Sequence, residues 1–127
     1  MDLIIDTHVL LWWDEGGARL PVRVRDALAD PENRIFVSAA AVWEIAIKRR
    51  AGKLRFTKGI AATVEINGFI SLPISAKDAE ISGELDWDHR DPLDRILLAQ
   101  CLSNNLTPVT ANAKLRARSE IAQFWAG

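Results

Sequence analysis

The sequence predicts an α/β fold: a three-layer α/β/α sandwich around a central parallel sheet of four to five strands. The chain has 127 residues, 49% hydrophobic and 26% charged, which is typical of a globular domain with a buried core. Short apolar runs alternate with longer segments of helical periodicity, which favours a parallel sheet covered on both faces. The sequence contains no repeat, low-complexity segment or Gly/Ser linker, so we expect one domain over residues 1–127.

The N-terminal part of the chain predicts one strand followed by two helices. Leu3 to Ile5 is a short apolar run of the kind that forms a buried strand. The apolar residues Val9 to Trp13 then predict a helix that stops near Gly16-Gly17. Proline is suited to the first turn of a helix, so a second helix is expected from Pro21 to about Ala29.

A second strand and a longer helix follow a turn at Asp30 to Asn33. The turn is predicted by its Asp, Pro and Asn residues, and Arg34 to Val37 then predicts the strand. Ser38 is a suitable N-cap for a helix that runs to Arg50. Gly52 is suited to close that helix, because glycine readily adopts the left-handed conformation found there.

The middle of the chain predicts two shorter helices around a third strand. We expect a helix from about Gly59 to Asn67 and a strand at Phe69 to Leu72. Ser75 is a suitable cap for a helix from Ala76 to Ser82. The polar segment Asp86 to Arg90 then predicts a loop.

The C-terminal part opens with the most clearly marked helix of the sequence. Asp91 and Pro92 begin this helix, which is expected to reach about Ser103. Pro108 to Thr110 predicts a fourth strand, and a last helix and a short strand near Ile121 to Phe124 complete the chain. Because ligands of such folds bind beyond the carboxyl ends of the strands, the residues that follow each strand are the candidates for a site.

Charge is unevenly distributed along the chain although the net charge is −1. The first 17 residues carry four acids and no Lys or Arg, residues 18–60 carry ten bases and four acids, and residues 61–94 carry eight acids and two bases. This pattern predicts an acidic pocket beside a basic surface. The single cysteine, Cys101, excludes an intrachain disulfide, and no apolar run approaches the roughly 20 residues that cross a bilayer. We therefore expect a cytoplasmic protein without a membrane segment.

Four polar residues lie at or near the carboxyl ends of the predicted strands: Asp6, Glu44, Asp94 and Asn112. Three of them are carboxylates, which repel one another when brought together unless a cation compensates their charge. The chain has no Cys/His cluster suited to zinc, so the expected cofactor is Mg²⁺, with Mn²⁺ as a second possibility. Such an ion can activate water and offset charge that develops on a phosphate, as in nucleases.

Each acid also has a structural interpretation. Asp6 is placed to cap the helix that follows it, although an acid that closes an apolar strand favours a functional role. Glu44 is four residues before Lys48, and this spacing leaves an ion pair and a functional role equally open. Asp91 precedes proline, which favours N-capping. Asp94 suits the helix dipole but borders the apolar face, where a surface acid is less expected.

Four blocks of sequence surround these residues. They are IDTHVLLW at 5–12, SAAAVWEIAIK at 38–48, HRDPLDRILLAQ at 89–100 and VTAN at 109–112. Together they resemble the PIN-domain family, and more closely the VapC-type toxins of bacterial toxin–antitoxin pairs. The blocks occur in the family's order and spacing and span nearly the whole chain, so the resemblance does not depend on one motif.

The resemblance implies a Mg²⁺-dependent ribonuclease that leaves a 5′-phosphate and a 3′-hydroxyl. It places the family's catalytic and metal-binding acids on Asp6, Glu44 and Asp94. Thr110 matches a Ser/Thr position at the end of the fourth strand, and Asp91 a position that is often acidic, both with supporting roles. The resemblance also implies a VapB-like antitoxin, whose C-terminal segment covers the acidic site, and a toxin homodimer.

Asn112 departs from the family's pattern, because the family usually has a fourth acid at this position. An amide oxygen can coordinate a metal ion but supplies no negative charge, so we expect weaker metal binding. An alternative is therefore a catalytically weakened or inactive PIN-like module that keeps an RNA- or protein-binding surface. An aspartate-nucleophile phosphatase fits less well, because His8 stands where that chemistry needs a second acid.

The basic segment supplies the candidates for binding the RNA substrate. The densest cluster follows Glu44 in the same helix and its exit loop, where it is suited to steer phosphates towards the metal. Its members are Lys48, Arg49, Arg50, Lys53 and Arg55. The adjacent Trp12 and Trp13 cannot both easily face one core, which predicts that a partner protein covers one of them.

Overall fold

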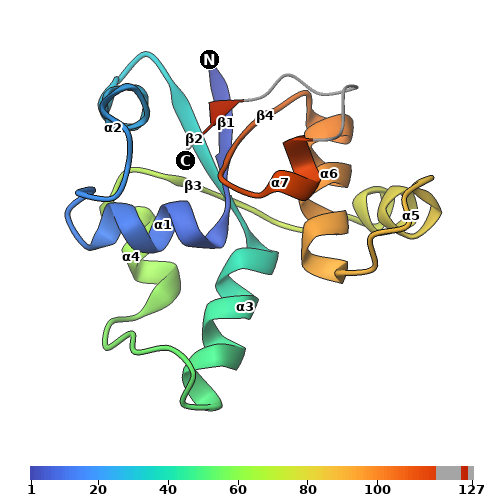
Figure 1. Cartoon of the computed structure of the whole chain (residues 1–127), viewed down its shortest axis with the longest axis horizontal. Coiled ribbons are helices and arrows are strands. Elements are labelled where there is room, and N and C mark those ends of the chain that lie inside the picture. Colours follow the sequence, from blue (N-terminus) through green and yellow to red (C-terminus); the bar gives the residue numbers. More distant parts are fainter. Residues whose placement is uncertain (117–123, 126–127) are drawn as a thin grey trace.

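A parallel β-sheet forms the centre of the protein in the computed structural model, which describes residues 1–116 and 124–125 (Figure 1). The strand order is β3-β2-β1-β4-β5, and every neighbouring pair is parallel. The four predicted strands are confirmed. The fifth lies at the end of the predicted segment, of which Ile121 falls outside the described residues. The strands are β1 (Asp2–Ile5), β2 (Arg34–Ser38), β3 (Ile70–Leu72), β4 (Thr107–Thr110) and β5 (Phe124–Trp125).

Helices cover both faces of this sheet, which confirms the predicted three-layer α/β/α sandwich. Figure 1 shows α1, α2 and α4 to one side of the strands and α5 and α6 to the other. No helix among the described residues has the length and apolar character that a membrane span requires. The helices are α1 (Thr7–Asp14), α2 (Val22–Ala29), α3 (Ala39–Arg50), α4 (Ile60–Ile66), α5 (Ala76–Glu84), α6 (Pro92–Asn104) and α7 (Ala113–Arg116).

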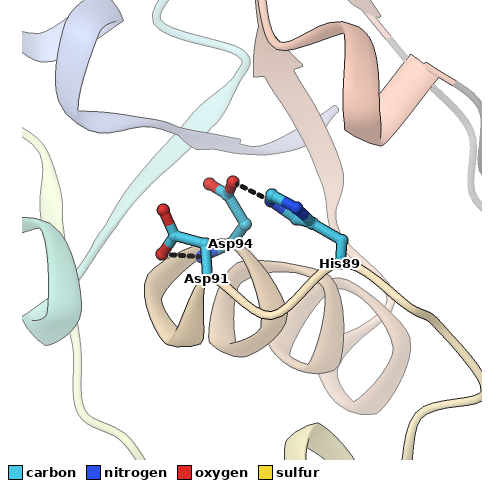
Figure 2. A group of neighbouring side chains, drawn as sticks. All are labelled: His89, Asp91 and Asp94. Carbon is cyan, nitrogen blue, oxygen red and sulfur yellow. Dashed lines mark hydrogen bonds and ion pairs between the residues drawn. The ribbon is translucent and has the colours of Figure 1, made fainter.

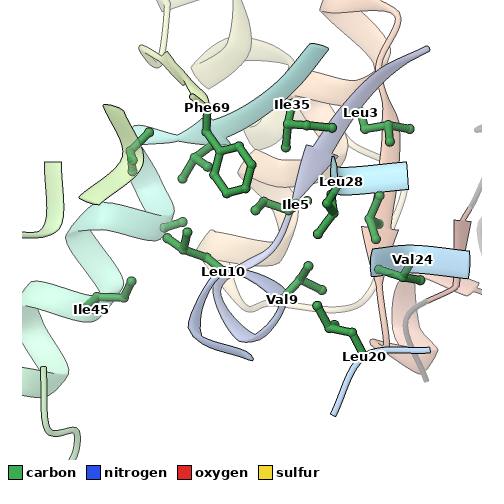
Figure 3. Packing of buried hydrophobic residues seen from close by; sticks show 14 of the residues in the cluster. Leu3, Ile5, Val9, Leu10, Leu20, Val24, Leu28, Ile35, Ile45 and Phe69 are labelled. Atoms are coloured by element: carbon green, nitrogen blue, oxygen red, sulfur yellow. The ribbon is translucent and has the colours of Figure 1, made fainter. Parts of the chain in front are cut away.

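The alternation of side chains along β1 separates two hydrophobic clusters. Leu3 and Ile5 point to the layer of α1, α2, α3 and α4, and Ile4 points to the layer of α6. All three side chains are at most 1% exposed. Each such apolar side chain contributes about 1.5–3 kcal/mol through burial. The larger cluster, part of which Figure 3 shows, includes Val9, Leu10, Leu20, Val24, Leu28, Ile35, Ile45 and Phe69. The smaller one includes Leu97, Leu98, Cys101, Leu106 and Leu115.

Most helix starts follow the predicted capping residues. Asp6 caps α1, which begins at Thr7 and includes the predicted segment Val9 to Trp13. Ser38 caps α3 by accepting a hydrogen bond from the Ala40 N–H at 3.0 Å. Ser75 caps α5 in a reciprocal pair of hydrogen bonds with Asp78. Asp91 caps α6, and Pro92 follows it in the first turn. The sequence therefore defines where the helices around the sheet begin.

The two adjacent tryptophans of α1 lie in different surroundings: Trp13 packs towards the core, and Trp12 lines a cavity. Trp13 packs against Phe69, with ring centroids 6.0 Å apart, and its Nε1 donates to Asn67 Oδ1 at 3.1 Å. Trp12 packs at the edge of the same cluster and lines the cavity described below. Both are half-buried, and cover of one of them by a partner stays a prediction. Among the tryptophans of residues 1–115, Trp43 is the most open to solvent, at 58%.

The strand order determines where a site can form. The chain moves outwards from β1 through β2 to β3 and then returns to β4 on the other side of β1. This reversal leaves a crevice at the carboxyl ends of β1 and β4, the usual place for a ligand in open parallel sheets. Ile5 pairs with Val37 on one side and Val109 on the other, so Asp6 follows at the same level as Ser38 and Thr110.

Candidate metal-dependent active site

A cavity of about 490 Å³ opens at the carboxyl ends of β1, β2 and β4, beside α3 and the start of α6. All three acids predicted to be catalytic, Asp6, Glu44 and Asp94, line it. Asp91 and Asn112, predicted to support them, line it as well. Sheet order thus brings together residues that are far apart in the sequence. The cavity is acidic, as the charge pattern predicts, and Lys48 is the one Lys or Arg among its described lining residues.

Asp6 is held by hydrogen bonds to both of its carboxylate oxygens. Oδ1 accepts from the Val9 N–H at 2.9 Å, and Oδ2 accepts from the Thr110 hydroxyl at 2.5 Å. Thr110 is fully buried, and its Oγ1 accepts in turn from the Asn112 N–H at 2.9 Å. Thr110 therefore orients Asp6 from the end of β4 and does not itself line the cavity.

Burial raises the pKa of Asp6, because the ionised carboxylate is poorly solvated there. The hydrogen bonds from Thr110 and the Val9 N–H act in the opposite direction, and the negative charge of Asp94 raises the pKa further. Asp6 and Asp94 are therefore close enough to repel each other when both are ionised. A cation between them would relieve this repulsion.

Glu44 forms the ion pair that its spacing allows and also lines the cavity. Its Oε2 accepts from Lys48 Nζ at 2.7 Å, which is the expected ion pair, and its Oε1 accepts from the Thr7 hydroxyl at 2.6 Å. The carboxylate also lines the cavity and is 19% exposed. Thr7 is a site residue that the sequence interpretation missed. Its position next to Asp6 is the signal that could have identified it.

His89, in the loop just before α6, lies beside the acids at the start of that helix. Asp91 Oδ1 accepts from the Leu93 N–H at 2.9 Å, which confirms its capping role. His89 Nε2 lies 2.6 Å from Asp94 Oδ2. Figure 2 shows both carboxyl groups on the same side of the first turn, with the imidazole beside Asp94. One ligand atom from each of these three residues lies within 4.8 Å of the others. His89, which lies in the predicted loop, is therefore close enough to these acids to belong to the site.

Arg95 fixes the loop that carries His89. Its guanidinium donates to four backbone carbonyls, those of Ser82, Leu85, Trp87 and His89, at 2.7–3.0 Å. The ring of Trp87 also packs against the imidazole, with centroids 4.9 Å apart. Sequence alone gives no signal for this role, because the partners of Arg95 are backbone atoms.

The donor set fits a hard divalent cation such as Mg²⁺. Carboxylate oxygens are the ligands that this ion prefers, and the cavity holds four carboxylates from three segments of chain. One oxygen each of Asp91 and Asp94 has no hydrogen-bond partner among the residues described in the structure. Cys101 offers no soft ligand, because it lies in the smaller core cluster and burial raises the pKa of its thiol to about 12. The observed acids therefore match the predicted cofactor.

Asn112 lines the cavity at the position where a fourth acid is usual in the family. Its Oδ1 accepts from the Lys114 N–H at 2.9 Å, at the start of α7. The amide oxygen thus has a structural partner, and the side chain brings no negative charge to the cavity. Weaker metal binding therefore stays a prediction.

The structure separates the basic residues predicted to bind RNA. Lys48 lines the acidic cavity, and Lys53 lines a smaller cleft beside it. Arg49 donates to the backbone carbonyls of Phe56 and Lys58, at 3.2 and 2.8 Å, so its guanidinium holds the loop after α3. Arg50 and Arg55 are exposed and line neither cavity.

Comparisons with known proteins identify the family. The model of the PIN domain family matches residues 3–121. A comparison with curated protein sequences gives no match. Among solved structures, VapBC2 from Rickettsia felis, bound to a DNA fragment from its promoter, is similar with a TM-score of 0.73 at 17% identity and covers 100% of both chains. VapBC-1 from nontypeable Haemophilus influenzae has a TM-score of 0.68 at 16% identity, covering 97% of this chain and 96% of that chain.

A third similar structure is VapC20 from Mycobacterium tuberculosis, described as a toxin that cleaves the sarcin-ricin loop. Its TM-score is 0.55 at 16% identity, with 84% of this chain and 86% of that chain covered. At these identities the likeness establishes a shared fold. The family itself is established by the match to the PIN domain model, which extends over nearly the whole sequence and includes all the acids of the cavity. The chain belongs to the PIN domain family.

Proposed function

We propose that the protein is a Mg²⁺-dependent endoribonuclease that acts in the cytoplasm as the toxin of a toxin–antitoxin pair. It hydrolyses RNA phosphodiester bonds with metal-activated water. The observation that carries this proposal is the convergence of Asp6, Glu44 and Asp94 in one cavity of a PIN domain. The similar VapBC structures and the RNA-cleaving VapC20 support the toxin assignment.

The residues of the cavity have distinct roles in this proposal. A bound Mg²⁺ would supply positive charge that lowers the pKa of a water molecule and offsets charge on the phosphate. Asp6 and Asp94 would hold the ion, and Glu44 would add a third negative charge beside it. Thr110 orients Asp6, and His89 orients Asp94, through the hydrogen bonds described above. Lys48 lies where it can attract the phosphate backbone towards the acids.

The direct test of this proposal is RNA cleavage by the purified protein in Mg²⁺ and in excess EDTA. The protein is expected to cut single-stranded RNA in Mg²⁺ and to lose this activity in EDTA or after Asp6→Asn. Mn²⁺ added after EDTA should restore cleavage. Activity that survives both EDTA and Asp6→Asn would exclude the metal mechanism.

Asn112→Asp is expected to strengthen Mg²⁺ binding about fivefold or more, because it adds a carboxylate to the cavity. The new carboxylate can still accept from the Lys114 N–H, so the start of α7 should be preserved. Isothermal titration with Mg²⁺ measures the affinity, and RNA cleavage at limiting Mg²⁺ measures the consequence.

The same variant separates the proposed enzyme from the alternative of an inactive RNA- or protein-binding module. A weakened enzyme should gain cleavage with Asn112→Asp. If wild type and Asn112→Asp bind RNA equally and neither cuts it in saturating Mg²⁺, the inactive module is the correct account.

We also propose that the protein forms a homodimer and is inhibited by a VapB-like antitoxin. An exposed apolar surface on α3 supports an association partner, because Trp43 and Ile47 lie one turn apart and are 58% and 48% exposed. Light scattering of the isolated chain at micromolar concentration should give the mass of a dimer. A monomer under these conditions would contradict the homodimer.

A further inference from the structure

A second cleft, of about 260 Å³, adjoins the acidic cavity. It is lined by residues of α1, by Lys48 of α3 and by the loops that follow these two helices, and we call it the basic cleft. Thr7, His8, Trp12 and Lys48 line both spaces, so the basic cleft begins where the acidic cavity ends. A chain that passes through the acidic cavity can therefore continue into the basic cleft.

The basic cleft holds cations whose charge is available to a ligand. Arg19 and Lys53 line it and are exposed, and neither side chain has a hydrogen-bond or ion-pair partner among the described residues. Lys48 is the third cation, and it pairs with Glu44. Glu15 is the one Asp or Glu that lines the basic cleft in the described chain. The side chains that line the basic cleft therefore carry a net positive charge, whereas those that line the acidic cavity carry a net negative charge.

An aromatic side chain stands at the junction of the two spaces. Trp12 is half-buried against the large hydrophobic cluster, which holds its indole in place. The ring of His8 lies beside it, with centroids 5.9 Å apart and an angle of 46° between the planes. A fixed indole beside free cations is the combination with which proteins bind single-stranded nucleic acids, because bases stack on the ring and phosphates contact the cations.

We propose that the basic cleft binds the nucleotides adjacent to the scissile phosphate of single-stranded RNA. Arg19 and Lys53 contact the phosphates, and Trp12 stacks on a base at the junction. An acidic peptide would satisfy the cations but has no base for the indole, so RNA matches more of the observed groups. This inference rests on the proposed function, which supplies the RNA and its cleavage in the acidic cavity.

Steady-state cleavage of a short fluorescent single-stranded RNA in Mg²⁺ tests the cations. The double variant Arg19→Ala/Lys53→Ala is expected to raise KM about tenfold or more and to change kcat by less than about twofold, because the reacting groups are untouched. The salt dependence of binding should weaken by about 0.7 in logarithmic slope for each lost phosphate contact.

Two single-charge variants serve as matched comparisons. Lys77→Ala removes an exposed cation from α5, on the opposite layer of the sandwich, and is expected to leave KM within about twofold of wild type. Arg55→Ala removes an exposed cation from the same loop as Lys53, at a position that lines neither space. The proposal predicts a smaller effect on KM for Arg55→Ala than for Lys53→Ala, whereas simple charge density predicts equal effects.

The stacking role of Trp12 has its own test. Trp12→Leu should raise KM about fivefold or more, and Trp12→Phe should recover most of this loss, because phenylalanine keeps an aromatic face. Leucine retains apolar packing against the core, and thermal unfolding of both variants checks that the fold is kept. Equal KM values for Trp12→Leu and wild type would contradict the stacking contact.

The outcomes distinguish this inference from the proposed function. If the wild type does not cleave RNA in Mg²⁺, the proposed function is wrong and the inference with it. If it cleaves RNA but the double variant has the same KM as Lys77→Ala, only the basic-cleft inference is wrong. Loss of affinity for a synthetic polyglutamate peptide in the double variant, with KM for RNA unchanged, would show a peptide site and also overturn the inference.

Discussion

Asp94→Asn is expected to reduce the rate of RNA cleavage by about 10³-fold or more at saturating Mg²⁺. The change removes a negative charge from the cavity while keeping nearly the same shape. The introduced amide retains an oxygen that can accept from His89, so the loop contact at the start of α6 should persist. What is lost is the charge that offsets a divalent cation beside Asp6. Single-turnover cleavage of a labelled RNA measures the effect on the chemical step.

Asp88→Asn is the matched control for this substitution. Asp88 is an exposed acid in the same loop region and does not line the cavity. The Asp88→Asn protein should cleave RNA at a rate within about twofold of wild type. Circular dichroism and thermal unfolding of both variants establish that the fold is intact. A folded Asp94→Asn protein that cleaves RNA as fast as Asp88→Asn would remove Asp94 from the proposed metal site.

Asp6→Asn is expected to make the metal-free protein more stable at neutral pH, with a melting temperature higher by about 3 °C or more. Burial raises the pKa of Asp6, so the ionised carboxylate destabilises the folded state when no cation is present. The Oδ1 of asparagine can still accept from the Val9 N–H, and its side-chain N–H can donate to the Thr110 hydroxyl oxygen. The variant thus removes a charge and retains the cap of α1.

The sign of the pH dependence follows from the raised pKa. Between the ordinary aspartate value of 3.8 and the raised folded value, the folded state holds the proton more tightly than the unfolded state. The contribution of Asp6 to stability therefore falls as pH rises through this window and stays unfavourable at neutral pH. Below the ordinary value the carboxyl is protonated in both states, so the advantage of Asp6→Asn should disappear there.

Urea unfolding in EDTA at neutral and acidic pH, and in Mg²⁺ at neutral pH, checks this prediction. Mg²⁺ should stabilise the wild type and should stabilise Asp6→Asn much less, because only the wild type has both acids to bind the ion. The prediction would be wrong if Asp6→Asn were less stable than wild type in EDTA at neutral pH, or if Mg²⁺ stabilised both proteins equally.

The sequence was sufficient to predict the layers of the fold and the acids of the site. Short apolar runs between helical segments indicated the parallel sheet, and the capping residues Asp6, Ser38, Ser75 and Asp91 defined the helix starts. Asp6 directly follows a strand, so its place at the carboxyl edge of the sheet could be inferred before the structure was known. Glu44 and Asp94 were candidates because they lie near the ends of predicted strands, and the family resemblance was needed to favour a functional role for Glu44 over an ion pair with Lys48.

Two further residues around these acids, Thr7 and Arg95, could not be predicted in the same way. Thr7 binds Glu44 across 37 positions of sequence, and Arg95 binds backbone carbonyls that have no sequence signature. Neither partnership follows from periodicity or propensity, because both depend on how segments meet in three dimensions. The cluster of Lys and Arg residues near the end of α3 did not by itself predict which cations are available to bind RNA, because this too depends on three-dimensional contacts. Arg49 is occupied by backbone carbonyls, whereas Arg19 joins the basic cleft from another loop.

The central claim is that Asp6 and Asp94 together hold a divalent cation in the acidic cavity. Crystals grown with saturating Mn²⁺ and measured for anomalous scattering test it most directly, because the signal locates the ion and its ligands. The account predicts an anomalous peak in the cavity with carboxylate oxygens of Asp6 and Asp94 at about 2.1–2.2 Å. An empty cavity at saturating Mn²⁺, or an ion bound without either aspartate, would contradict it.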